Sequence, residues 1–311
     1  MDTNRENFVP AGPAAVTLSA HAKINLVLDV VRRREDGYHE LRMVNQKLEL
    51  ADAVTLEKIP EGIELSCSDP SLPCGPENLA WRAAEAFFAR FGISGGVKIR
   101  LEKRIPAGAG LAGGSSDAAA VLRGLGRLYP AENGADLFAR EGAGAPVAYP
   151  SWMWRLGADI PFCFAGCSAA LTEGIGEKIT ALPGLAHGCI VMAKPEISIS
   201  TRAVFEAVDA QEDPVHPDAD AAAEALRCGD AAGVCAHFGN SLAAVTKAWV
   251  PEVARLEEIL MRCGALGAQM SGSGPTVFGV FENEADAQRA LEAVRESGLA
   301  PFACVTRPVR H

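Results

Sequence analysis

The strongest constraint on the fold is a glycine-rich loop that runs directly into a helical pattern. Residues 105–120 read IPAGAGLAGGSSDAAA, and a strand-like stretch, VKIRLEKRI, leads into them. After the two serines, apolar residues recur at the spacing of one helix face. A strand, a tight glycine loop and a helix N-terminus bring free backbone amides together, and such amides bind phosphate. The sequence therefore predicts a phosphate loop at 105–116, with Ser115 and Ser116 as helix N-caps.

The glycine spacing leaves two kinds of phosphate ligand to consider. Gly108, Gly110 and Gly113 form the G-x-G-x-x-G of dinucleotide-binding proteins, which would make the chain a nicotinamide-dependent oxidoreductase. Against this, no βαβ half precedes the loop, Pro106 interrupts the junction with the strand, and no strand ending in an acid follows the helix. A Walker-A motif is also absent from the sequence. The pattern favours a loop that cradles a nucleoside triphosphate, with the oxidoreductase as a distant alternative.

Alternation of apolar and polar residues predicts a long strand at 16–30. Its polar face carries His21, Lys23 and Asn25 in a row, which is typical either of a solvated sheet face or of a functional site. Both interpretations stay open from the pattern alone. Further strands are expected at 44–57 and 97–105, and a helix at 76–92.

A second unit is expected after a boundary near 180–188. Its strands are predicted at 189–193, 267–271, 276–281 and 302–307, and its helices from 201 and at 251–263 and 284–296. Strands that alternate with two or three helices suggest an α+β sandwich. The acidic run at 206–224 is the internal candidate for a segment without stable structure.

Composition excludes several classes of function. The 311 residues carry a net charge of −10, which disfavours nucleic acid as a partner because phosphate backbones require a basic surface. The N-terminus lacks the apolar core of a secretory signal, and no apolar run is long enough for a membrane span. Nine scattered cysteines indicate reduced thiols, with Cys163 and Cys167 as core residues rather than metal ligands. We therefore expect a cytoplasmic protein.

Several segments together resemble the GHMP kinases, a superfamily that includes galactokinases, homoserine kinases and mevalonate kinases. PAGAGLAGGSSDAA resembles the phosphate loop of that family, AKINLVLDV its N-terminal strand, and MSGSGPTVFGVF its C-terminal glycine loop. AKIN with DGYHEL, LGADIPF and KPEISISTRAVF resemble the branch that phosphorylates 4-(cytidine 5'-diphospho)-2-C-methyl-D-erythritol. The matching segments follow in order from residue 17 to residue 306.

The resemblance implies a two-domain α+β fold. Residues 1–185 would form a mixed α/β N-terminal domain and residues 186–311 a ferredoxin-like α+β sandwich, with the active site in the cleft between them. It implies transfer of the γ-phosphoryl of ATP to the 2-hydroxyl of the methylerythritol unit, in the non-mevalonate route to isoprenoid precursors. The alternatives are another GHMP kinase of the mevalonate or homoserine type, or a silent binding protein on the same scaffold. The partners would be small molecules, and monomer and homodimer both stay open.

The resemblance also implies roles for single residues. Asp159 would take the hydroxyl proton and Lys23 would be its cationic partner. ATP would bind with Mg²⁺, for which Ser115 or Asp117 is the candidate ligand. The expected nucleotide contacts are Asn78, Lys103, Pro106, Gly108, Gly110, Leu111, Gly113, Gly114, Ser115 and Ser116. The expected substrate contacts are Asn25, Tyr38, His39, Thr201, Phe205, Gly272, Ser273 and Gly274. Among these, Tyr38 and Phe205 would stack on the cytosine ring and His39 would pair with its edge.

Overall fold

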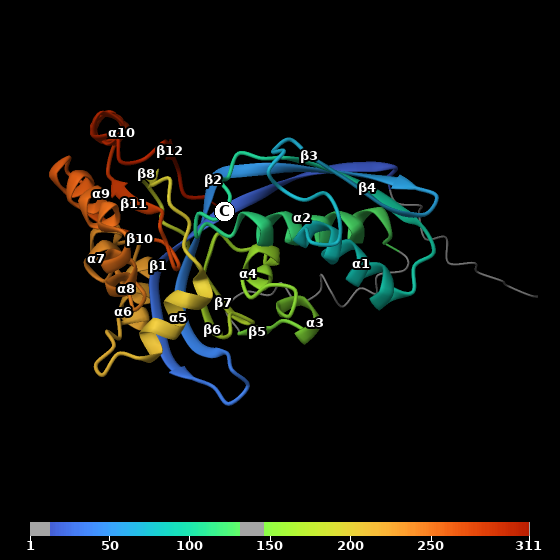
Figure 1. The fold of residues 1–311 in the computed structure, drawn as a ribbon, viewed down its shortest axis with the longest axis horizontal. Helices are drawn as coiled ribbons and strands as arrows, with labels where there is room; N and C mark the ends of the chain where they lie inside the picture. The colour runs from blue at the N-terminus through green and yellow to red at the C-terminus, as the bar shows by residue number, and fades with distance from the viewer. Residues whose placement is uncertain (1–12, 131–145, 311) are drawn as a thin grey trace, which may run out of the picture.

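The computed structural model of the chain describes residues 13–130 and 146–310, and they form two sheets with helices packed against them (Figure 1). The larger sheet is built on two long antiparallel strands, β1 (Ala15–Arg33) and β2 (His39–Ile59). The turn between them contains Gly37, whose positive φ of 84° is accessible to glycine at no steric cost. β1 covers the strand that was predicted at 16–30 and extends it to residue 33, so that prediction is confirmed.

The other edge of β2 is shared by two strands. β4 (Gly96–Glu102) pairs with the end of β2 and β6 (Ala169–Gly174) with its start. The order across the sheet is β3–β4–β2–β6–β7–β5, and β1 pairs with β2 and β9. The remaining strands of this sheet are β3 (Gly62–Cys67), β5 (Val147–Ala148), β7 (Lys178–Leu182) and β9 (Gly239–Asn240).

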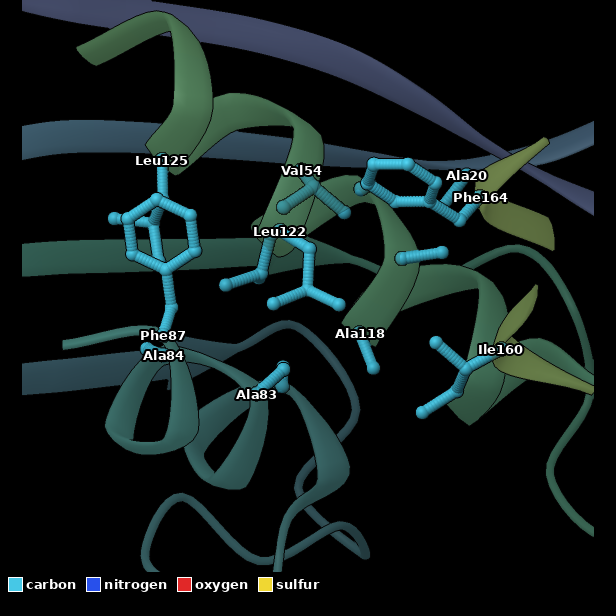
Figure 2. Close-up of a cluster of buried hydrophobic side chains, with 14 of the residues drawn as sticks. Ala20, Val54, Ala83, Ala84, Phe87, Ala118, Leu122, Leu125, Ile160 and Phe164 are labelled. Carbon is cyan, nitrogen blue, oxygen red and sulfur yellow. The ribbon is translucent and has the colours of Figure 1, made fainter. Parts of the chain in front are cut away.

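Two helices, α1 (Leu79–Phe91) and α2 (Gly113–Leu128), form a core with the larger sheet. Figure 2 shows Phe87 of α1 and Leu125 of α2 pointing toward one another, with Val54 of β2 in the same cluster, and all three side chains are fully buried. The short helices α3 (Ser151–Trp154) and α4 (Ile160–Phe164) close this core from the side.

The start of α2 differs from the prediction. The helix begins at Gly113, and its N-cap is Ala112, which has a left-handed φ of 57° and no side-chain cap. Ser115 and Ser116 therefore lie inside the first turn, so their assignment as N-caps is wrong. The physical reason is that the loop enters the helix through the left-handed residue, which leaves the first-turn amides without a side-chain acceptor.

The second sheet consists of four antiparallel strands in the order β10–β11–β8–β12, which is the arrangement of a ferredoxin-like unit. They are β8 (Cys189–Lys194), β10 (Gly267–Met270), β11 (Val277–Phe281) and β12 (Phe302–Thr306). Helices α9 (Pro251–Arg262) and α10 (Glu284–Ser297) pack on one face of this sheet. The other face packs against β1 through residues such as Ile190 and Phe278. The expected α+β class is confirmed.

Between β8 and β10 the chain forms the two helices that the sequence pattern predicted, α5 (Thr201–Asp209) and α9. It also forms helices that the pattern did not predict, which are α6 (Ala219–Arg227), α7 (Ala231–Ala236) and α8 (Ala243–Trp249). The expectation that the acidic run lacks structure is wrong, because α5 and α6 occupy most of it. Asp218 caps α6 by accepting the amides of Asp220 and Ala221, so an acid that favours disorder by composition here begins a helix. Within the described part of the chain, no helix combines the length and apolar character needed to cross a membrane.

Candidate active site

A cavity of about 600 Å³ lies where the phosphate loop, β1 and a second glycine loop meet. The second glycine loop is the segment 271–276, which joins β10 to β11. Most of the residues predicted for the site line it: Lys23, Asn25, Asn78, Lys103, Pro106, Gly108, Gly110, Leu111, Gly113, Gly114, Ser115, Asp117, Asp159, Thr201, Phe205, Gly272 and Ser273. These residues come from segments that are far apart in the sequence. The cavity therefore brings together the predicted phosphate loop and the predicted catalytic pair.

The phosphate loop approaches the cavity with a tightly folded backbone. Gly108 and Gly110 have φ values of 59° and 72°, in the left-handed region that favours glycine. Ala112 follows in the same region, and it is the one non-glycine residue with positive φ in the described part of the chain. Left-handed backbone at a non-glycine residue is strained, and such strain clusters at ligand sites. The loop delivers the free N-terminus of α2 to the cavity, where its amides can bind an anion.

The two glycine loops touch each other. The hydroxyl of Ser271, at the end of β10, donates to the carbonyl of Gly110 over 3.1 Å. A β-carbon added at Gly110 would lie only 2.6 Å from the carbonyl oxygen of Ser271. The backbone amide of Lys23 also donates to the carbonyl of Leu111 over 3.1 Å. Glycine at position 110 is therefore required both by its φ and by the close approach of the second loop.

Lys23 and Asp159 meet at the side of this cavity. The Lys23 Nζ lies 3.3 Å from Asp159 Oδ1, and its side chain is 5% exposed whereas that of Asp159 is 34% exposed. Asp159 directly precedes α4, but its side chain caps no amide of that helix. The carboxylate is thus aimed at the ammonium and at open space rather than at the helix. A carboxylate that is partly exposed to the cavity can accept a proton from a hydroxyl group bound there.

The predicted polar row of β1 is divided by an irregular register. β1 shifts against β2 between His21 and Lys23 and again between Asn25 and Val27. Lys23 and Asn25 face the cavity and are almost completely buried, so the solvated interpretation is wrong for these two. His21 does not line this cavity, and its Nδ1 lies 2.8 Å from the Leu48 carbonyl oxygen.

Lys103 lies between two buried carboxylates beside the loop. Its ammonium contacts Asp52 Oδ2 and lies 2.5 Å from Asp117 Oδ2. Burial alone would lower the pKa of Lys103, but the charges and hydrogen bonds of Asp117 and Asp52 raise it overall. Burial raises the pKa of Asp117 to about 7, although the Lys103 ammonium acts in the opposite direction. The lysine therefore stays charged at the wall of the cavity.

Asp52 is a residue of this site that the sequence interpretation missed. Its Oδ1 accepts the backbone amides of Arg104 and Ile105, at 2.5 and 2.9 Å, where the phosphate loop begins. The signal was present in the sequence, because Asp52 takes an apolar position in the alternation of Leu48, Leu50, Val54 and Leu56. A charged residue on an apolar strand face requires a partner, and here the partner is the loop.

Two of the three predicted cytosine-binding rings, His39 and Phe205, contact each other, and the third, Tyr38, contacts Trp154. Tyr38 is 46% exposed and meets Trp154 edge to face, with 6.1 Å between ring centroids. His39 stacks on Phe205 at 4.6 Å, and its Nε2 lies 2.8 Å from Asp209 Oδ1. Trp154 is the last residue of α3, so its contact with Tyr38 places α3 next to the predicted substrate residues.

Four predicted site residues do not line the cavity: Ser116, Tyr38, His39 and Gly274. Ser116 is 2% exposed, and its hydroxyl donates to the His21 carbonyl over 2.6 Å. That hydroxyl is therefore engaged with β1 and not directed at a phosphate. Asn78 does line the cavity, but it also caps α1 by accepting the Ala80 amide over 2.9 Å.

Two comparisons by sequence identify relatives. Residues 78–166 match the family described as "GHMP kinases N terminal domain", and residues 222–299 match "GHMP kinases C terminal". A 4-diphosphocytidyl-2-C-methyl-D-erythritol kinase of Acetivibrio thermocellus is 41% identical over 94% of this chain and 99% of its own length. The enzyme of the same name from Moorella thermoacetica is 43% identical over 94% of this chain and 98% of its own length.

Solved structures agree with these relatives. A crystal structure of 4-(cytidine 5'-diphospho)-2C-methyl-D-erythritol kinase superimposes with a TM-score of 0.75 at 37% identity, covering 94% of this chain and 99% of that chain. A homoserine kinase from Cytophaga hutchinsonii superimposes with a TM-score of 0.71 at 15% identity, covering 97% of each chain, which shows the shared fold alone. Kinases of this family take ATP together with a divalent metal ion. The chain is thus an ATP-dependent small-molecule kinase, and the oxidoreductase alternative is not favoured. By sequence and by fold, the chain belongs to the GHMP kinases, within the family of 4-diphosphocytidyl-2-C-methyl-D-erythritol kinases.

Proposed function

We propose that this chain transfers the γ-phosphoryl group of ATP to the 2-hydroxyl of 4-(cytidine 5'-diphospho)-2-C-methyl-D-erythritol, as a step in the non-mevalonate route to isoprenoid precursors. The observation that supports this most is the contact of Lys23 with Asp159 in the cavity that the phosphate loop also lines. The identity with relatives that carry the name of this activity supports the choice of acceptor.

In the proposed reaction Asp159 accepts the proton of the acceptor hydroxyl while that oxygen attacks the γ-phosphorus. Lys23 balances the charge of the carboxylate and of the alkoxide that develops. Phosphoryl transfer needs positioning and charge neutralisation more than covalent help from the protein. A nearly buried ammonium 3.3 Å from a partly exposed carboxylate fits these two needs.

The nucleotide would lie along the glycine loop. Its phosphates would accept hydrogen bonds from the amides of the loop and of the first turn of α2, with Lys103 nearby as a fixed positive charge. Leu72 and Pro73, from the segment between β3 and α1, line the same cavity beside Asn78 and would contact the adenine. In this proposal Ser116 supports the loop through β1 and does not bind phosphate.

We propose Mg²⁺ as the divalent ion. One carboxylate oxygen of Asp117, Oδ1, is buried without a hydrogen-bond partner among the described residues, and Ser115 is half-buried on the cavity wall. Mg²⁺ commonly takes one or two protein ligands together with substrate phosphates and water, so these two residues fit the ion. When bound, the ion would neutralise charge on the transferring phosphates.

The acceptor would bind on the side of the cavity formed by α5 and the second glycine loop. Tyr38, His39 and Phe205 are the proposed contacts of the cytosine ring. The methylerythritol and diphosphate groups would contact the remaining substrate residues, which are Asn25, Thr201, Gly272, Ser273 and Gly274. The Thr201 and Ser273 hydroxyls already lie 2.8 Å apart, which brings α5 and the glycine loop together.

The division into domains at residue 185, a cytoplasmic location and a small-molecule partner without nucleic acid belong to the same proposal. A cluster of buried residues between β1 and β8 joins the two sheets, so the cavity between them depends on both units. Monomer and homodimer are both compatible with this proposal.

The first experiment measures ADP release by the purified protein with ATP, Mg²⁺ and the cytidine-containing acceptor, in parallel with mevalonate, homoserine and galactose. The expected result is ADP release with the cytidine-containing acceptor and none with mevalonate, homoserine or galactose. Turnover of mevalonate or homoserine without turnover of the cytidine compound would establish the other GHMP kinase type instead.

Two variants test the assigned roles. Asp159→Asn is expected to lower kcat by about 10²–10⁴-fold with little change in either KM, because it removes the proton acceptor and keeps the shape. Wild-type turnover of this variant would rule out Asp159 as the base. Tyr38→Ala is expected to raise KM for the acceptor far more than KM for ATP, and equal changes would contradict the stacking role.

A further inference from the structure

We infer that Asn45 and Thr172 are positioning residues, which hold the Asn25 amide so that its oxygen faces the Lys23 ammonium. This inference rests on the proposed function, because it concerns the same catalytic pair. The observation behind it is a continuous chain of hydrogen bonds that begins at Lys23 and crosses three strands.

The chain of hydrogen bonds has three steps. Lys23 Nζ donates to Asn25 Oδ1 over 2.8 Å, and Asn25 Nδ2 donates to Asn45 Oδ1 over 2.7 Å. Asn45 Nδ2 then donates to Thr172 Oγ1 over 2.9 Å. The three residues beyond the lysine are at most 1% exposed. All of these bonds are short and shielded from water, a setting in which hydrogen bonds are electrostatically stronger.

The strand register explains why these side chains meet. Asn25 of β1 and Asn45 of β2 are direct partners across the antiparallel pair, so their side chains leave the same face of the sheet. Thr172 of β6 stands two pairs further along, opposite Met43 of β2, and therefore on the same face of the sheet as Asn45. The row therefore crosses β1, β2 and β6 beneath the cavity.

The direction of every bond follows from the lysine. An ammonium only donates, so it requires the oxygen of the Asn25 amide. This fixes Asn25 Nδ2 on the opposite side, where it needs an acceptor, and Asn45 Oδ1 supplies it. Asn45 Nδ2 in turn needs Thr172 Oγ1. Without the outer residues, the only other acceptor for Asn25 Nδ2 among the described contacts would be the Met43 sulfur at 3.5 Å, and a thioether is a weak acceptor.

A row of buried polar side chains is costly compared with an apolar row of the same volume. Met43, two residues from Asn45 on the same face of β2, is a buried apolar residue, so this face could have been filled in that way here too. The side-chain amides of Asn25 and Asn45 and the Thr172 hydroxyl each take part in a hydrogen bond of this row, and the row ends at one charged group, Lys23. We therefore assign its role to the position of that group.

This assignment also limits what Asn25 can offer to the acceptor. Its Nδ2 is engaged with Asn45, and one lone pair of its Oδ1 is engaged with Lys23. A carbonyl oxygen accepts two hydrogen bonds, so the second lone pair of Oδ1 is the group left for an acceptor hydroxyl. Asn25 would then orient the lysine and receive a hydroxyl with the same oxygen.

The test compares Thr172→Val, which keeps the size of threonine and removes the hydroxyl, with Thr172→Ser, which keeps the hydroxyl and removes the methyl group. Thr172→Val is expected to lower kcat about tenfold, as the loss of one buried hydrogen bond from the row that holds the Asn25 amide implies, with KM for ATP unchanged within about twofold. Thr172→Ser keeps the hydroxyl that accepts from Asn45 and should leave kcat near the wild-type value. Asn45→Leu should lower kcat at least as much, and if it does not fold, the Thr172 pair decides.

Two results would overturn the inference. One is a folded Thr172→Val or Asn45→Leu protein with wild-type kcat. The other is an equal loss of kcat and of thermal stability in Thr172→Val and Thr172→Ser, which would mean packing alone.

A crystal structure of Thr172→Val without ligands gives a readout that does not depend on the acceptor. Movement of the Lys23 ammonium away from Asp159 is expected, and an unchanged 3.3 Å contact would contradict the inference. If the wild-type protein phosphorylates none of the acceptors, the proposed function fails while this structural comparison still decides the positioning role.

Discussion

Replacement of Asp52 by asparagine should weaken the binding of ATP without touching the acceptor. Asp52 is buried beneath the phosphate loop, where Oδ1 accepts the Arg104 and Ile105 amides and Oδ2 meets the Lys103 ammonium. Asparagine keeps an oxygen for the two amides, since it has the same shape. It places an amide NH₂ against the ammonium, so one charged contact is lost and two donors face each other.

The size of the effect follows from that single change. A hydrogen bond to a charged group contributes about 1.5–3 kcal/mol. Lys103 keeps its contact with Asp117, so the lower end of this range applies. About 1.5 kcal/mol corresponds to a rise of about tenfold in KM for ATP. Asp52→Ala removes the acceptor of the two amides as well and should destabilise the fold by about 3–5 kcal/mol, as the breaking of a buried ion pair does.

The assay measures ADP release at varied ATP and saturating acceptor, and then at varied acceptor and saturating ATP. Glu57→Gln is the matched control, because it removes one negative charge from an exposed position of the same strand. Thermal unfolding shows whether each variant is folded. A folded Asp52→Asn protein with wild-type KM for ATP, or with equal rises in both KM values, would refute the role of Asp52 in positioning the loop.

Three further changes have outcomes that the structure predicts. Burial raises the folded-state pKa of Asp117 to about 7, so its carboxyl removes stability as the pH rises from about 4 to 7. The difference in Tm between Asp117→Asn and wild type should therefore be more favourable to the variant at pH 8 than at pH 4, and an equal difference at both pH values would contradict this. Gly110→Ala should lower kcat/KM for ATP at least about tenfold, because its Cβ would lie 2.6 Å from Ser271 O, whereas Gly264→Ala, with similar φ and open space, should not. Phe87→Ala should lower the free energy of unfolding by about 3–5 kcal/mol in denaturant titrations and leave KM for ATP unchanged.

Much of the fold was predictable because its elements follow from local pattern. The strand before the glycine loop, helix α2 after it and the strands of the second sheet lie where period and turn residues predicted them. The region from α6 to α8 was missed because its helices are only six to nine residues long, which is too short for the apolar period to distinguish a helix. The start of α2 was misplaced because the left-handed Ala112, a non-glycine residue, gives no warning in the sequence.

The site was predictable in part. The glycine loops are recognisable from their composition. The resemblance to GHMP kinases implied the pair Lys23 and Asp159, whose contact the structure shows. The supporting residues were not found in that way. Asp52 could have been recognised as an acid on an apolar strand face, whereas Asn45 and Thr172 look like ordinary strand residues until the register is known.

The sequence by itself determined where the glycine loop and the helix after it form, because glycine conformations and helix periodicity are properties of neighbouring residues. Only the tertiary structure decided which charges meet. The shifts in the register of β1 set which side chains face the cavity, and the packing of β1 against the second sheet brings the two glycine loops together. Contacts such as Lys23 with Asp159 or Lys103 with Asp52 depend on how strands pair across long separations in the chain. That pairing is fixed by the burial of the whole core, which no short stretch of sequence contains.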